Sequence, residues 1–118
     1  MKVVNRIKAN EDFALTIKQG KTYQSSSYRL HVKKSENSYT RIGISVSKKL
    51  GNAVVRSRIK RQIRAICDSV IQYDKQALDI VIIAKNHFLE NSFQDNKNQF
   101  IDLLNLQVGV NKWKKVQN

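Results

Sequence analysis

The sequence predicts an α+β fold, with helices packed on a mixed β-sheet, and three observations predict this class. The 118 residues fit the usual size of one domain, and neither proline nor a low-complexity linker divides them. Segments with the alternation of strands and segments with helical periodicity follow one another along the chain. A strand, a long helix and a nearly all-apolar strand occur in that order, which favours a crossover unit with parallel pairing. We therefore expect a single domain over residues 1–118.

The first helix is expected to begin at Asn10, as an N-cap residue followed by two acidic residues that favour a helix N-terminus. Phe13 and Ile17 supply its apolar positions, and Gly20 is a suitable residue to end it.

Two strands are expected next, at residues 27–34 and about 39–47. Their apolar side chains alternate onto one face, which helices must cover: Tyr28, Leu30, Val32, Ile42, Ile44 and Val46. The opposite face places Arg29 and His31 beside Gly43 and Ser45, so it is polar and has little side-chain bulk. Two interpretations of this face stay open, a shallow groove for a ligand and an ordinary solvated sheet face.

The main helix is expected over about residues 53–73. An apolar stripe at helical spacing consists of Val55, Ile59, Ile63, Ile66 and Val70. Arg56, Lys60 and Arg64 recur at every fourth position along one flank of this stripe. Like charges at that spacing destabilise a helix by a few tenths of a kcal/mol per pair, so the pattern favours a bound anion.

A strongly apolar strand at residues 79–84 should be buried on both faces. Ser92 and Asp95 resemble a capping box that opens a last helix, which should end before or near Gly109. Its apolar positions are Phe93, Phe100, Ile101, Leu103 and Leu104. Residues 110–118 are expected to form a frayed basic tail.

Positive charge is concentrated in one segment of the chain. The net charge is +13, from 22 lysines and arginines against nine acidic residues. Eight of these cations, and no acidic residue, fall between residues 41 and 64: Arg41, Lys48, Lys49, Arg56, Arg58, Lys60, Arg61 and Arg64. Scattered lysines would suit a role in solubility, whereas this clustering indicates a polyanionic partner.

Nucleic acid is the expected polyanion, and an anionic membrane is its competitor. A membrane-surface helix needs apolar side chains free to enter the lipid, but here the apolar stripe is required for the core. No apolar run of roughly 18 residues could span a bilayer, and no signal peptide is recognised at the start. The single cysteine, Cys67, fits a reducing compartment, and we expect a cytoplasmic protein.

Catalysis by the chain alone is not expected. The acidic residues are spread thinly, nothing brings His31 and His87 together, and no metal-ligand spacing occurs around Cys67. We predict no catalytic and no metal-binding residues, and no cofactor bound by the protein.

One stretch is specific enough to indicate a family. The 24 residues from Arg41 to Arg64, RIGISVSKKLGNAVVRSRIKRQIR, closely resemble the signature of the protein subunit of bacterial ribonuclease P. The segments Asn5–Lys8, Asn10–Phe13 and Asp79–Ala84 are also similar to that family. The resemblance covers roughly residues 5 to 105.

The resemblance implies an α-β-β-β-α-β-α sandwich with a four-stranded mixed sheet and a left-handed β-α-β crossover, an exception to the usual right-handed rule. It implies an accessory subunit of an endoribonuclease that removes the 5′ leader of precursor tRNA, with catalysis by an RNA subunit that requires Mg²⁺. The implied partners are the catalytic RNA and the precursor tRNA leader, with no membrane, and the protein alone is expected to be a monomer.

The resemblance also assigns two sets of residues. The motif expected to face the catalytic RNA comprises Lys48, Lys49, Asn52, Arg56, Arg58, Lys60, Arg61 and Arg64. The set expected to hold the leader comprises Phe13, Ile17, His31, Lys60 and Arg64. Ile17 departs from the family by standing where an aromatic residue is common, and Ser57 by replacing an asparagine. A ribosomal or general RNA-structure protein is the alternative, but it gives no reason for a small-residue groove beside the cationic helix.

Overall fold

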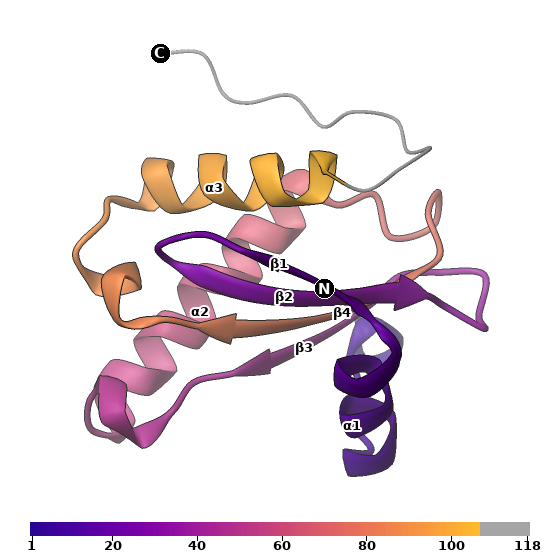
Figure 1. Cartoon of the computed structure of the whole chain (residues 1–118), viewed down its shortest axis with the longest axis horizontal. Helices are drawn as coiled ribbons and strands as arrows, with labels where there is room; N and C mark the ends of the chain where they lie inside the picture. Colours follow the sequence, from indigo (N-terminus) through magenta and orange to yellow (C-terminus); the bar gives the residue numbers. More distant parts are fainter. Residues whose placement is uncertain (107–118) are drawn as a thin grey trace.

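The computed structural model describes residues 1–106. Its helices and strands follow one another in the order that the resemblance implies (Figure 1). Short 3₁₀ turns are found at Val3–Asn5, Lys48–Leu50 and Asn86–Leu89. The main elements are α1 (Asn10–Gln19), β1 (Lys21–Gln24), β2 (Tyr28–Lys34), β3 (Arg41–Ser45), α2 (Ala53–Val70), β4 (Leu78–Ala84) and α3 (Phe93–Asn105). The α+β class is confirmed. β1 is the one strand that the alternation of the residues had not indicated.

The sheet has the strand order β1-β2-β4-β3, so β4 is an inner strand and β3 lies at an edge. β2 pairs antiparallel with both β1 and β4, whereas β3 pairs parallel with β4, which makes the sheet mixed. This confirms the predicted crossover unit, in which α2 connects two parallel neighbouring strands. β4 is buried along its length apart from the half-buried Ile83, as its apolar sequence predicted.

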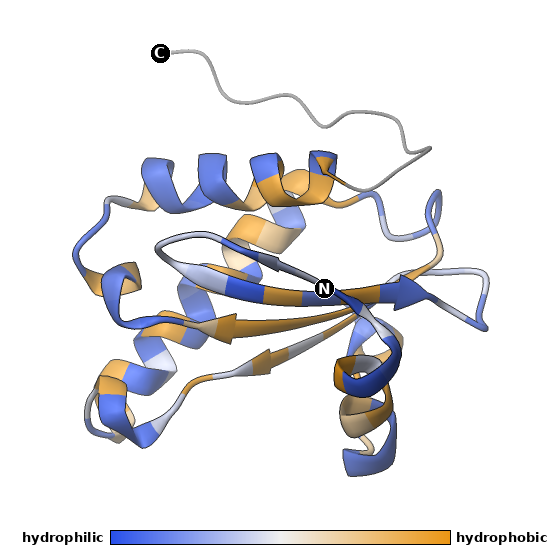
Figure 2. Ribbon diagram, in the orientation of Figure 1, coloured by the Kyte–Doolittle hydropathy of each residue, from blue (hydrophilic) through white to orange (hydrophobic). Residues whose placement is uncertain are grey.

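Helices lie on both sides of the sheet. α2 and α3 pack on the face that carries the apolar side chains of β2 and β4, and α1 lies on the other side (Figures 1 and 2). In the core, Tyr28 is fully buried and meets the rings of Phe88 and Phe100 edge-to-face at 5.6 and 5.9 Å. Its hydroxyl donates to the backbone oxygen of Asn96 at 3.0 Å, so the prediction that Tyr28 faces the core is confirmed.

Several predicted boundaries were wrong by a few residues. α1 starts at Asn10 itself, with Ala9 as an N-cap that offers no side-chain bond. α2 ends at Val70, because the backbone of Ile71 is extended and its side chain is buried. The cap of α3 is confirmed, since the Ser92 hydroxyl accepts from the Asp95 amide at 3.1 Å. Phe93, however, is 44% exposed and does not belong to the core. The predicted tail, residues 110–118, lies outside the described residues.

Gly20 ends α1 for a steric reason. It ends the helix as predicted, and its φ of −74° is open to any residue, so a left-handed backbone is not what requires glycine here. A Cβ at Gly20 would lie 2.5 Å from the backbone oxygen of Thr16 and 2.9 Å from the amide nitrogen of Val32. Glycine is therefore needed here because the chain turns tightly against β2.

Candidate nucleic-acid interface

The loop before α2 fixes where the cationic helix begins. Gly51 has a φ of +151°, a conformation that L side chains rarely adopt, and a Cβ there would lie 2.8 Å from the side chain of Val55. Asn52 then caps the helix, because its side-chain oxygen accepts from the amide of Val55 at 3.0 Å. Upstream, the Ser47 hydroxyl accepts from the amide of Lys49 at 3.2 Å. Lys48 and Lys49 are thereby held at the start of the helix, with exposed side chains.

The apolar stripe of α2 sets the direction of its cations. Ile59, Ile63 and Ile66 are at most 1% exposed, which places this side of the helix firmly against the sheet. The flank made by Arg56, Lys60 and Arg64 is consequently half-buried, and the remaining helix cations, Arg58 and Arg61, are exposed. The predicted division between an apolar stripe and a cationic remainder is confirmed.

None of the five α2 cations forms an ion pair within residues 1–106. Several acidic groups have partners elsewhere: Asp68, for example, accepts from the hydroxyl of Tyr73 at 2.8 Å. The Nε–H of Arg56 is buried and lacks a hydrogen-bond acceptor within the same part of the chain. A donor left in that state costs about 1–3 kcal/mol, so the helix surface favours a ligand that brings acceptor oxygens.

Arg41 does not belong to this surface of unpaired cations, although the sequence analysis grouped it with them. Its Nε and Nη2 donate to the two carboxylate oxygens of Asp79 at 3.0 and 2.8 Å, and its Nη1 donates to Asp12 at 3.2 Å. Bonding to Asp79 is the main reason why the pKa of Arg41 is raised above its ordinary value. The prediction of a free cationic segment that begins at residue 41 was therefore wrong. Within residues 1–106, the cations of this segment that form no ion pair begin at Lys48.

The polar face of the sheet is organised in rows of side chains that run across the strands. Arg41, Asp79 and Lys33 form the first row, in which Lys33 Nζ lies 3.5 Å from Asp79. The middle row consists of Gly43, Val81, His31 and Thr22. The outer row consists of Ser45, Ile83, Arg29 and Gln24.

α1 covers the middle row and leaves the outer row open. The ring of Phe13 lies so close over Gly43 that a Cβ there would be 2.6 Å from Phe13 Cε2. Val81 is fully buried and His31 is 7% exposed, whereas Arg29 and Gln24 in the outer row are exposed. α1 thus covers one part of this face, which neither interpretation had predicted, and solvent reaches the rest.

His31 and Ile17 occupy different environments from Phe13. The ring Nδ1 of His31 is hydrogen-bonded to the hydroxyl of Thr22 at 3.1 Å. Desolvation, followed by the nearby charge of Arg29, lowers the pKa of His31 below its ordinary value. A neutral, buried imidazole offers no open ring face, whereas Ile17 is 38% exposed on α1. The leader-binding assignment of these residues stays a prediction.

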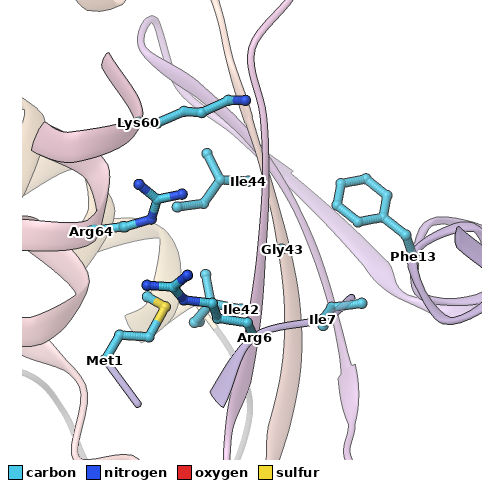
Figure 3. A pocket seen from close by; sticks show the side chains of 9 residues that line it. All are labelled: Met1, Arg6, Ile7, Phe13, Ile42, Gly43, Ile44, Lys60 and Arg64. Atoms are coloured by element: carbon cyan, nitrogen blue, oxygen red, sulfur yellow. The ribbon is translucent and has the colours of Figure 1, made fainter. Parts of the chain in front are cut away.

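A cavity of about 140 Å³ lies at the β3 edge, between α1 and α2 (Figure 3). It brings together Phe13 from α1, Gly43 from β3, and Lys60 and Arg64 from α2. The remaining lining residues are Met1, Arg6, Ile7, Ile42 and Ile44. The sequence did not assign Arg6 to the site, because only the pairing of the N-terminal segment with β3 places it there.

Groups suited to catalysis are not assembled in the described part of the chain. No three His, Cys, Asp or Glu side chains within residues 1–106 gather into a metal-binding group. His31 bonds to Thr22, whereas His87 bonds to Glu90 on the surface. Cys67 is fully buried, and desolvation raises its pKa, so its thiol stays protonated inside the core.

A match to a family model shows to which family this chain belongs. Residues 1–106 match the model described as Ribonuclease P. The chain belongs to the ribonuclease P protein family. The ribonuclease P protein component of Mesoplasma florum is 41% identical over 105 residues, covering 88% of this chain and 96% of that protein. Its counterpart in Bacillus cereus is 37% identical over 116 residues, covering 98% and 100%.

Solved ribonuclease P proteins share the fold. A Staphylococcus aureus RNase P protein mutant, described as defective in mRNA degradation activity, superposes with a TM-score of 0.77 and 31% identity over 87% of each chain. The RNase P protein of Thermotoga maritima gives 0.75 with 28% identity, over 88% of this chain and 98% of that one. As a ribonuclease P protein component, the chain acts in tRNA processing within an endoribonuclease and has an RNA partner there. No helix of residues 1–106 is long and apolar enough to cross a membrane.

Proposed function

We propose that this chain binds the catalytic RNA through the unpaired cations of α2 and the loop before it, and holds the 5′ leader of precursor tRNA at the β3 edge. One observation carries the proposal: a helix with five cations that form no ion pair within residues 1–106 borders a low-relief strand edge, which an aromatic ring faces from the other side. The first surface suits folded RNA, and the second suits an extended single strand.

On the helix side, the mechanism is electrostatic. Phosphates of the catalytic RNA would displace counterions by contacting Lys48, Lys49, Arg58 and Arg61, whose side chains are all exposed. Arg56 would donate its unsatisfied Nε–H to a phosphate oxygen once its side chain turns toward the RNA. Asn52 contributes by starting the helix, and its side-chain nitrogen stays available for a polar contact.

On the edge side, the mechanism is positional. Gly43 lets the ring of Phe13 pack directly on β3, and this ring is only half-buried, so a base would stack on its exposed part. Lys60 and Arg64 line the same cavity from α2 and would hold the phosphate backbone of the leader. Endonucleolytic removal of the leader, at the bond that leaves the mature 5′ end, is assigned to the RNA subunit and its Mg²⁺. The chain's part is to keep the leader next to that centre.

The test compares leader-bearing precursor with mature tRNA in the reconstituted holoenzyme. We expect tighter binding of the precursor, and a loss of about tenfold in that preference for the Lys60→Ala/Arg64→Ala variant, since a charged hydrogen bond contributes about 1.5–3 kcal/mol. The matched control is Arg58→Ala/Arg61→Ala, which removes the same charge from the exposed side of α2 and should weaken RNA assembly but keep the preference. Equal affinity of the wild-type holoenzyme for the two tRNAs would contradict the leader-binding role.

A further inference from the structure

The N-terminal segment holds Arg6 in place by burying the residues on either side of it. Asn5 is 3% exposed, and its Nδ2 donates to the backbone oxygen of Thr40 at 2.9 Å. Ile7 is 8% exposed, and its amide donates to the backbone oxygen of Ile42 at 2.9 Å. Arg6 itself forms a parallel bridge with Ile42, at the start of the β3 edge. Its backbone is therefore fixed while its side chain stays exposed.

The side chain of Arg6 points to the same side of β3 as the α2 cations. Figure 3 shows the guanidinium groups of Arg6 and Arg64, together with Lys60, on the α2 side of the strand, and Phe13 on the other side. Apolar side chains of Met1, Ile42 and Ile44 complete this part of the lining, and no carboxylate of residues 1–106 lines the cavity. None of the three cations forms an ion pair within residues 1–106.

Three positive groups around one cavity repel each other unless an anion lies between them. The volume of about 140 Å³ is far above the roughly 15 Å³ that a single water needs, so a tetrahedral oxyanion fits. Two of the three groups are guanidinium forks, which bind phosphate oxygens in pairs more specifically than an ammonium does. A carboxylate presents two oxygens in one plane, whereas the oxygens of a phosphodiester are arranged tetrahedrally and can face both guanidinium groups, so the site favours a phosphodiester.

We propose that Arg6 completes, with Lys60 and Arg64, a binding site for one phosphodiester group of RNA at the β3 edge. The phosphate belongs either to the precursor leader or to the catalytic RNA, and both sources present the same chemistry. The leader source rests on the function proposed above, because a strand that passes from α2 to Phe13 must cross this edge. The site makes the N-terminal segment a third RNA-binding element, separate from α1 and α2.

The experiment uses Arg6→Ala in the full chain, with Lys8→Ala as the matched control. Lys8 is exposed, lies two residues from Arg6 and does not line the cavity, so its variant removes the same charge from the same segment. One arm measures assembly with the catalytic RNA alone. The other measures the preference of the assembled holoenzyme for leader-bearing precursor over mature tRNA. Thermal melting of each free protein checks the fold.

We expect Arg6→Ala to weaken one arm about tenfold, and Lys8→Ala to change both arms less than threefold. Arg6→Lys, which keeps the charge but loses the fork, should recover less than half of the loss on a logarithmic scale. A loss in assembly alone assigns the phosphate to the catalytic RNA, and a loss in preference alone assigns it to the leader. If Arg6→Ala matches Lys8→Ala in both arms while Lys60→Ala/Arg64→Ala still reduces the preference, this inference fails and the leader-binding role stands. If neither variant changes the preference, the leader-binding role fails, and the site survives only through the assembly arm.

Discussion

Arg41 and Arg64 are both arginines of the family signature, yet the structure gives them opposite roles. Arg41 is tied to the fully buried carboxylate of Asp79 by two hydrogen bonds, and to Asp12 on α1 by a third. Arg64 has no acidic partner within residues 1–106 and lines the cavity. Arg41 therefore acts on the fold, where it joins α1 to the sheet, and Arg64 acts at the surface.

The contacts of Arg41 predict that its two carboxylate partners, Asp79 and Asp12, contribute very differently to the free energy of unfolding. Asp79→Asn leaves Arg41 and Lys33 beside an uncharged, buried amide, so it should lower the free energy of unfolding by about 3 kcal/mol. Asp12→Asn should cost less than about 1 kcal/mol, because the Asp12 side chain is 44% exposed and its ion pair is screened by water. Urea unfolding of both variants measures the difference. Similar decreases in the free energy of unfolding would show that the buried carboxylate stabilises the fold no more than the exposed one.

His31 predicts how stability depends on pH. Its pKa is lowered in the folded chain, by desolvation first and by Arg29 second, so the folded state binds the proton less readily than the unfolded state. As the pH falls below about 6.5, the unfolded chain is protonated first, and the free energy of unfolding decreases until the folded pKa is reached. His31→Gln should show a smaller decrease between pH 7 and pH 5 in urea titrations. Parallel curves for the two proteins would rule out this contribution.

At the scale of elements, the position of α1 depends on one missing side chain. The ring of Phe13 lies where a Cβ of residue 43 would be, at 2.6 and 2.9 Å from two ring carbons. Neither residue alone predicts this contact, which joins a helix to the edge strand of the sheet. The contact sets how closely α1 approaches β3, and with it the position of the Phe13 wall of the cavity at the β3 edge.

This contact predicts that Gly43→Ala displaces Phe13 and lowers the free energy of unfolding by about 1–3 kcal/mol, the usual cost of overpacking. Ser45→Ala, on the same face of the same strand, is the control and should change stability little. Adding Phe13→Leu to Gly43→Ala should return part of the loss, because the two sites interact directly. Additive losses in the double variant would mean that the ring does not press on β3.

Periodicity predicted the elements well where one face of an element is buried. The α2 stripe, the core face of β2 and the doubly buried β4 all follow from alternation or helical spacing. It failed where long-range contacts decide. β1 is mostly exposed and carries no clear pattern, and α2 stops at Val70 because Ile71 turns into the core. The coverage of His31 by α1 could not be predicted either, since alternation gives a face and not what lies on it.

At the scale of the whole molecule, the sequence revealed the amount and the location of charge but not its availability. Asp79 is 38 residues away from Arg41, and Asp12 is 29 away, so no local window shows that these carboxylates neutralise it. Arg6 is the reverse case, a cation far from the signature that the pairing with Ile42 brings to the site. The cationic surface consequently reaches beyond the 24-residue signature from Arg41 to Arg64.

A surface of unpaired cations predicts how RNA assembly depends on salt. Each phosphate contact that releases a counterion adds about 0.7 to 0.9 to the slope of log K against log salt concentration, so Arg58→Ala/Arg61→Ala should flatten the slope by about 1.5. Lys18→Ala/Lys34→Ala removes the same charge from exposed positions on α1 and β2, away from the α2 surface, and should change the slope much less. Assembly constants measured between roughly 50 and 200 mM salt test this difference, since that range alters such affinities strongly.

If both double variants flatten the slope equally, the RNA responds to net charge and not to the arrangement of cations on α2. In that case replacing Arg41 would weaken assembly as much as replacing Arg58. The distinction between structural and RNA-facing arginines would then have no effect on binding.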